Sequence, residues 1–128
     1  MINLFDGAAS FNRPLASWNI RKVKKLAYIF ARASSFNQPL EAWDLGQATQ
    51  IVGMFEAASA YNQPLGLWNV ARVTEMKSIF EHATAFDQPL GAWDVSSATI
   101  MSCMFSHASR FNQPLDSWSP PLPSSNVG

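Results

Sequence analysis

The feature that most constrains the fold of this chain is a repeat of 25 residues, present in five copies without an insertion. The motif reads FNRPL at 11–15, FNQPL at 36–40, YNQPL at 61–65, FDQPL at 86–90 and FNQPL at 111–115. A fixed period of this length is typical of solenoids, in which each repeat forms one coil that packs only on its neighbours. We therefore expect one domain at 1–119, with coils at 1–25, 26–50, 51–75, 76–100 and 101–119, and a Pro/Ser-rich tail at 120–128.

Aromatic residues fall almost entirely at positions 5, 11 and 18 of the repeat, which hold 15 of the 16 in the chain and leave out only Tyr28. Because large apolar side chains that recur once per coil stack along the axis, we interpret these columns as structural ladders of the core. Their members are Phe5, Phe30, Phe55, Phe80 and Phe105, then Phe11, Phe36, Tyr61, Phe86 and Phe111, then Trp18, Trp43, Trp68, Trp93 and Trp118.

The hydrophobic pattern changes its period once within each copy. The segment MKSIFEHA at 76–83 places apolar residues at i, i+3, i+4 and i+7, which predicts a short helix with Thr74 as its N-cap. The segment LWNV at 67–70 alternates, with Trp68 and Val70 on one side, which predicts a short strand. We therefore expect an α/β repeat solenoid with one short helix and one short strand in each coil.

The FNQPL motif lies between these two predicted elements and forms the corner of the coil. Pro39 fixes its own φ and biases Gln38 toward extended backbone, so the chain must turn there. Copies of Asn37 stacked about 4.8 Å apart can satisfy backbone groups and bond along a ladder. The repetition is therefore interpreted as structural, and a repeated ligand site remains the alternative.

Composition excludes several other classes of protein. The chain is 48% hydrophobic and 14% charged, which argues against disorder, and no apolar run approaches the roughly 20 residues of a membrane helix. No secretory signal is visible. The lone Cys103 makes no internal disulfide, and His82 and His107 do not match a zinc spacing, although they should stack on adjacent coils. We expect no catalytic residue, metal or cofactor.

One polar column is a candidate binding site. Asn19, Asp44, Asn69 and Asp94 share position 19, between two inward-facing residues. The favoured interpretation is an Asx-turn, and the alternative is a ladder of oxygens that holds Ca²⁺. Asp44 and Asp94 should lie roughly 10 Å apart, near the spacing of a glycosidase pair, but Asn69 stands between them and no cleft is implied. We therefore expect no enzyme.

A basic cluster is the second candidate site. Residues 1–32 carry a net charge of +5 and residues 33–128 carry −5. Such a cluster suits an anionic partner, namely nucleic acid, lipid headgroups or the acidic end of another copy, and a solvated loop is an equal alternative. The signal for nucleic acid is weak because the aromatic residues belong to the core. The cluster consists of Arg21, Lys22, Lys24 and Lys25.

The segment MFEAASAYNQPLGLWNVARVTEMKSIF at 54–80 resembles the BspA-like leucine-rich surface-protein repeat, a domain of unknown function. The Phe-Asn-Gln corner, the Trp-Asx-Val segment and the Val-Thr pair carry this resemblance. It implies a leucine-rich-repeat-like solenoid without enzymatic activity, usually part of a larger protein that is secreted or anchored at the cell surface. The chain departs from the pattern at Ala48 and Ala98, where the family has Val, and it shows no anchor.

Two functions follow as expectations. The first is a non-enzymatic scaffold for protein binding or adhesion, in which the solenoid is a rigid frame. The second is a structural spacer or self-assembling solenoid that stacks through its oppositely charged ends. A glycan ligand is a weaker expectation, because Ala9 and Lys24 interrupt the Ser and Thr columns.

Overall fold

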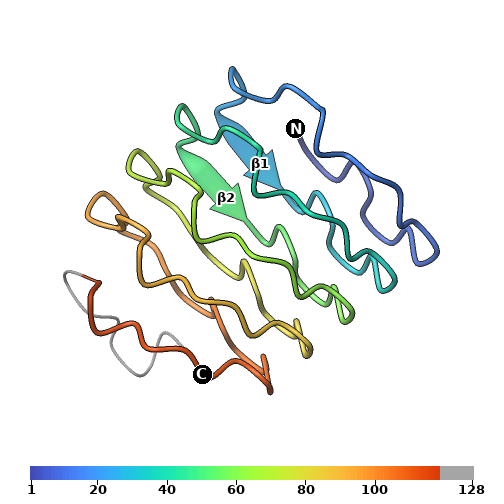
Figure 1. The fold of residues 1–128 in the computed structure, drawn as a ribbon. Coiled ribbons are helices and arrows are strands. Elements are labelled where there is room, and N and C mark those ends of the chain that lie inside the picture. Colours follow the sequence, from blue (N-terminus) through green and yellow to red (C-terminus); the bar gives the residue numbers. More distant parts are fainter. Residues whose placement is uncertain (119–128) are drawn as a thin grey trace.

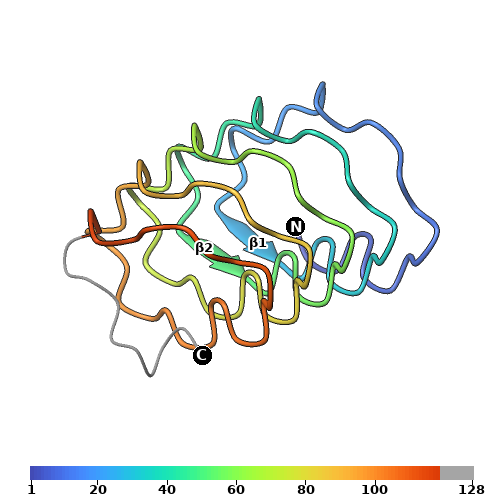
Figure 2. The ribbon, with the colours of Figure 1, turned by 60° about the horizontal axis from the view of Figure 1, so that its bottom comes forward.

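The computed structural model describes residues 1–118, which wind into five coils stacked side by side along one axis (Figure 1). We number these coils 1 to 5 from the N-terminus. Viewed from another side, each coil closes into a flattened loop and the next begins beside it (Figure 2). The predicted solenoid with a period of 25 residues is confirmed. Residue 119 and the predicted tail at 120–128 lie outside the described residues.

Two short strands hold the first coils together, β1 (Lys25–Ala27) and β2 (Gln50–Val52). They pair in parallel with an offset of 25 residues, which places Leu26 opposite Ile51. Isolated bridges continue the same pairing along coils 1 to 4, from Ile2 to Ala27, from Gln50 to Glu75 and from Glu75 to Ile100. The strand of this fold therefore spans the junction between two sequence copies.

The predicted helix is wrong, because residues 1–118 contain no helix. Segment 76–83 is a run of turns in which Ser78 and His82 adopt left-handed backbone, with φ of 59° and 58°. The His82 N–H donates to the carbonyl of Ser106 in the next coil at 2.8 Å, where a helix would bond four residues back. The apolar residues at the helical spacing are all buried, so the pattern identified the inward side chains but not the backbone.

The predicted N-cap is therefore wrong as well. Both the N–H and the Oγ1 of Thr74 donate to the carbonyl of Thr49, at 2.8 Å and 3.1 Å. Thr99 repeats these bonds to Thr74. These threonines therefore connect one coil to the next by hydrogen bonds and do not begin a helix.

The predicted strand at 67–70 is also wrong. The Trp68 N–H donates to the carbonyl of Leu65, and the Val73 N–H donates to the carbonyl of Val70, so two turns flank this segment. The alternation that suggested a strand is nevertheless real, since Leu67 is 80% exposed while Trp68 and Val70 are buried. Alternation therefore predicted the direction of each side chain and misplaced the strand.

The aromatic ladders form the core, as predicted. The rings of Phe30, Phe55 and Phe80 stack at 5.7 Å between centroids from coil to coil. Phe55 also stacks on Tyr61 of its own coil at 4.3 Å. Coil 1 is the exception, because its Trp18 is 40% exposed while the other four tryptophans are buried.

The predicted ladder at the corner is present, but each Asn side chain of coils 1 to 3 bonds to the backbone and to the Gln of the next coil and not to the next Asn side chain. The Oδ1 of Asn37 accepts the N–H of Asn62 at 2.9 Å and the side-chain amide of Gln63 at 3.2 Å. Asn62 does the same for Asp87 and Gln88 in the next coil. A turn that would leave backbone donors unpaired is satisfied by the neighbouring copy.

Candidate functional site

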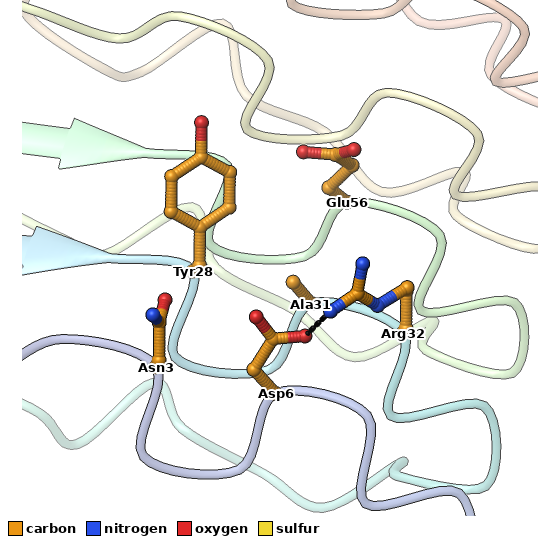
Figure 3. Close-up of a pocket in the computed structure, with 6 residues that line it drawn as sticks. All are labelled: Asn3, Asp6, Tyr28, Ala31, Arg32 and Glu56. Atoms are coloured by element: carbon orange, nitrogen blue, oxygen red, sulfur yellow. Dashed lines mark hydrogen bonds and ion pairs between the residues drawn. The ribbon is translucent and has the colours of Figure 1, made fainter.

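The clearest candidate site is a hollow of about 260 Å³ on coils 1 to 3 (Figure 3). All of its lining residues come from positions 3, 6 and 7 of the repeat. The Arg32 side chain reaches across from coil 2 and pairs with the carboxylate of Asp6 in coil 1. The lining residues are Asn3, Asp6, Tyr28, Ala31, Arg32 and Glu56.

Backbone geometry presents these side chains. Asn3, Tyr28 and Arg32 have left-handed backbone, with φ of 54°, 54° and 57°. Positions 4 and 5, between these left-handed positions, send their side chains into the core of coils 2 to 5, while Asn3 and Arg32 are exposed and Tyr28 is half-buried. Few residues other than Gly and Asn adopt this conformation without cost, which makes these positions unusual.

The ring of Tyr28 fits in its position because residue 53 in the next coil is a glycine. A Cβ at Gly53 would lie 2.3 Å from Cε1 of Tyr28, which is impossible without movement. Gly53 also has a φ of +55°, a value that glycine adopts freely. The ring of Tyr28 therefore lies against a bare stretch of backbone, and the glycine is needed for that contact.

Charge in the hollow is unevenly compensated. Asp6 pairs with Arg32, whereas no hydrogen bond or ion pair within residues 1–118 holds the carboxylate of Glu56. Burial raises the pKa of Glu56, the negative charge of Glu81 in the next coil raises it further, and Arg32 opposes both effects. A partner with a positive group would relieve this repulsion.

Position 7 continues as a histidine pair. His82 and His107 stack on adjacent coils with ring centroids 4.6 Å apart, as predicted, and both are exposed. Cys103 is also exposed, at position 3 of coil 5. Within residues 1–118, no group of three or more His, Cys, Asp or Glu side chains is placed to hold a metal ion.

The polar column at position 19 forms Asx-turns, as the favoured interpretation predicted. The Oδ1 atoms of Asn19, Asp44, Asn69 and Asp94 each accept the N–H two residues on, at 2.9 to 3.2 Å. Ser96 adds a hydroxyl bond to Asp94 at 2.6 Å, and these hydrogen bonds lower the pKa of Asp94. None of the four lines the hollow, and their role in binding stays a prediction.

The basic cluster lies on the surface of coil 1. Arg21 and Lys22 occupy a turn that the Val23 N–H closes on the carbonyl of Ile20 at 2.9 Å, and Lys25 begins β1. All four basic side chains are exposed, and none lines the hollow. A role in binding an anionic partner stays a prediction.

Sequence reasoning missed the hollow. Tyr28 is the one aromatic residue outside the three columns, and this exception was a visible signal. The pairing of Asp6 with Arg32 joins positions 6 and 7 of different coils, which the period alone does not indicate. The variability of positions 3, 6 and 7 among the copies was the second signal.

Comparison with known proteins supports the repeat assignment. No curated protein and no solved structure matches the chain. The described part of the chain holds no helix that is long and apolar enough to cross a membrane. One family matches residues 1–73 and again residues 43–123, and together these matches cover nearly the whole sequence. The chain therefore belongs to the family described as Mycoplasma protein of unknown function, DUF285.

Proposed function

We propose that this solenoid is a non-enzymatic binding module, which recognises a protein partner or an adhesion target through one face. We call this the variable face and define it as the side chains at positions 2, 3, 6 and 7 of coils 1 to 5. It contains the hollow, the histidine pair and Cys103.

The observation that carries the proposal is the distribution of variation among the five copies. Positions 5, 14, 15 and 18 keep Phe, Pro, Leu and Trp in every copy, because packing requires them. Position 2 differs in every copy, as Ile, Ala, Val, Lys and Ser. Position 3 also differs in every copy, as Asn, Tyr, Gly, Ser and Cys. Positions 21, 22 and 25 also differ in every copy, but the face at positions 2, 3, 6 and 7 is the variable region that is hollowed, and a hollowed, variable face on a constant frame is suited to recognition.

Hydrogen bonding also distinguishes the constant residues of the frame from the residues of the variable face. Side chains at the corner and at positions 18 and 24 bond to the neighbouring coil, and so they maintain the stack. On the variable face of the described coils, the Arg32–Asp6 pair is the only side-chain bond between residues. The remaining side chains are free to contact a partner.

Family resemblance supports a location and an architecture for this module. The likeness to BspA-like surface repeats favours a protein that is secreted or held at the cell surface, with a solenoid comparable to leucine-rich repeats. In such an architecture the coils present side chains at fixed spacing, so binding costs little loop ordering.

A peptide-display selection tests the proposal. Random peptides are selected on the immobilised chain and then measured on two triple variants with circular dichroism as a check of folding. The face variant is Tyr28→Ala/Arg32→Ala/Glu56→Ala. The control variant is Ser35→Ala/Gln47→Ala/Arg72→Ala, which changes three exposed side chains elsewhere.

Selected peptides should bind the wild type and the control equally and should lose most of their affinity for the face variant. Peptides that bind both variants equally would place recognition elsewhere. A selection that never enriches above an unrelated protein would argue against a peptide-binding module.

A further inference from the structure

The tryptophan ladder has a direction. Each buried indole N–H donates to a leucine carbonyl in the preceding coil, from Trp43 to Leu15 at 2.8 Å and from Trp118 to Leu90 at 2.9 Å. The tryptophan side chain of each of coils 2 to 5 therefore reaches back to the coil before it. Trp18 leans outward from coil 1, and among residues 1–118 no acceptor bonds its indole N–H.

Leu4, like Trp18, is exposed in coil 1 although its equivalents in the other coils are buried. Position 4 is fully buried in coils 2 to 5, where it is Ile or Met, whereas Leu4 is 49% exposed. The exposed apolar surface of coil 1 thus has the shape and chemistry of an internal coil surface. It faces away from coil 2.

Coil 5 carries the complementary surface. A hollow of about 370 Å³ is lined mainly by apolar side chains that would receive the rings of a following coil. The carbonyl of Leu115 accepts only the Trp118 N–H among residues 1–118, whereas Leu15, Leu40, Leu65 and Leu90 each also accept an indole N–H. The hollow is lined by Phe105, Ala108, Phe111, Asn112, Gln113 and Leu115.

In the described part of the chain, unpaired backbone N–H groups of coil 5 and unpaired backbone carbonyls of coil 1 occupy matching positions of the repeat. Phe80 and His82 donate their N–H groups to carbonyls of coil 5, but within residues 1–118 the equivalent N–H groups of Phe105 and His107 have no acceptor. In coil 1 the carbonyls at the matching positions, Leu4 and Asp6, receive no N–H from the described residues. Unpaired edges of this kind pair readily with a second chain.

We propose that two copies of this chain join head to tail, with coil 1 of one copy docked on coil 5 of the other in the 25-residue register. The Trp18 indole donates to the Leu115 carbonyl, the rings of Phe5 and Phe11 cover the hollow at Phe105 and Phe111, and Leu4 packs beside them at the same interface. The N–H groups of Phe105 and His107 donate to the carbonyls of Leu4 and Asp6. The contact is heterologous, so it leaves the same two surfaces free for further copies.

Charge supports a second copy as the occupant. Coil 1 has five basic side chains and one acidic side chain, for a net charge of +4. The described residues of coil 5 are neutral, with Arg110 and Asp116, and the negative charge lies in coil 4, which has one basic and three acidic side chains for a net charge of −2. Because one coil separates this negative charge from the docking surface, about 4.8 Å and less than the Debye length in moderate salt, it still attracts the positive coil 1 and makes association sensitive to salt.

Sedimentation velocity over a range of protein concentrations tests the proposal with matched variants. Leu4→Lys places a charge on the docking surface, and Leu67→Lys makes the same change at an exposed leucine in coil 3. The wild type and Leu67→Lys should form dimers and larger species as concentration rises, and more so at about 0.01 M than at about 1 M salt. Leu4→Lys should stay monomeric in every condition.

Cysteine trapping tests the register. In a Cys103→Ser background, Ala9→Cys/Ser109→Cys joins position 9 of coils 1 and 5, which are too far apart within one chain to form a disulfide. Oxidation should yield a ladder of covalent multimers. The control Ala9→Cys/Ser59→Cys should yield mostly monomer.

A wild type that stays monomeric at every concentration and salt level would overturn the proposal. Equal association of the two lysine variants, or equal cross-linking of the two cysteine pairs, would overturn the assignment of coils 1 and 5 as the docking surfaces. These outcomes are independent of the peptide selection, because that experiment changes side chains of the variable face and this one changes the ends of the stack.

Discussion

The indole N–H of Trp68 donates a hydrogen bond of 2.8 Å to the carbonyl of Leu40, 28 residues earlier in the chain. Trp68 also stacks on Trp93 of the next coil at 6.2 Å between ring centroids. One side chain thus joins three successive coils by packing and by a buried hydrogen bond. Loss of this residue should therefore destabilise the packing of all three coils.

Trp68→Ala should lower the free energy of unfolding by about 3–5 kcal/mol, since it leaves a cavity and removes the bond to Leu40. Trp18→Ala should cost clearly less, because Trp18 is part-exposed and lacks that bond among the described residues. Urea denaturation followed by circular dichroism measures both. Asn69→Ala, which removes only an Asx-turn bond to Ala71, should cost about 1 kcal/mol. Equal losses for the two tryptophan variants would contradict the ladder.

Asn37→Ala should lower stability by about 1–3 kcal/mol, because the N–H of Asn62 and the amide of Gln63 both lose their acceptor. Asn112→Ala is the matched control at the same position of coil 5. Within residues 1–118 the Oδ1 of Asn112 accepts no hydrogen bond, so its removal should cost much less in the monomer. Thermal unfolding at low protein concentration compares the two, and a larger loss for Asn112→Ala would refute the proposed direction of the ladder.

Gly53→Ala should destabilise the chain by about 2 kcal/mol or more, because the new Cβ meets the ring of Tyr28. The left-handed backbone alone is the smaller part of this cost, since Ser78 and Cys103 adopt it at the same position. The change should therefore be milder in a Tyr28→Ala background. A double-mutant cycle measures the difference, and strict additivity of the two changes would exclude the contact.

Tyr61→Phe should raise stability by about 1 kcal/mol, because the buried hydroxyl of Tyr61 has no partner among the described residues. Burial raises the pKa of this phenol, and the charge of Glu41 adds to the effect. A raised pKa means that the folded state holds its proton more tightly, so stability is full below the ordinary value of 10.0 and falls as pH rises above it. Denaturation between about pH 9 and 11 should show this loss in the wild type and less of it in Tyr61→Phe. Identical alkaline profiles would contradict the burial of the hydroxyl.

The parts of the fold that follow from sequence are those that repeat. Constant residues such as Trp68 and Pro39 reveal the period, the core columns and the corner, because packing and turn geometry depend on residue type. The Asx-turns followed for the same reason, since Asn69 and its equivalents bond locally.

The backbone between the columns did not follow, because Gly or Asn marks its left-handed positions in only a minority of the copies, at Asn3, Gly7 and Gly53. Tyr28, Arg32 and His82 occupy them, where Gly or Asn would have marked a turn. Bonds to the next coil override the local preference for helix in 76–83. The hollow escaped prediction because it depends on contacts between different positions of neighbouring coils.

Hydrogen exchange of the tryptophan indole N–H groups, followed by NMR on dilute monomer, tests the solenoid most directly. The structure predicts that four indoles, Trp43, Trp68, Trp93 and Trp118, exchange slowly because each bonds to a buried leucine carbonyl. Trp18 should exchange fast. Fast exchange of all five indoles would contradict the ladder and the fold that is built on it.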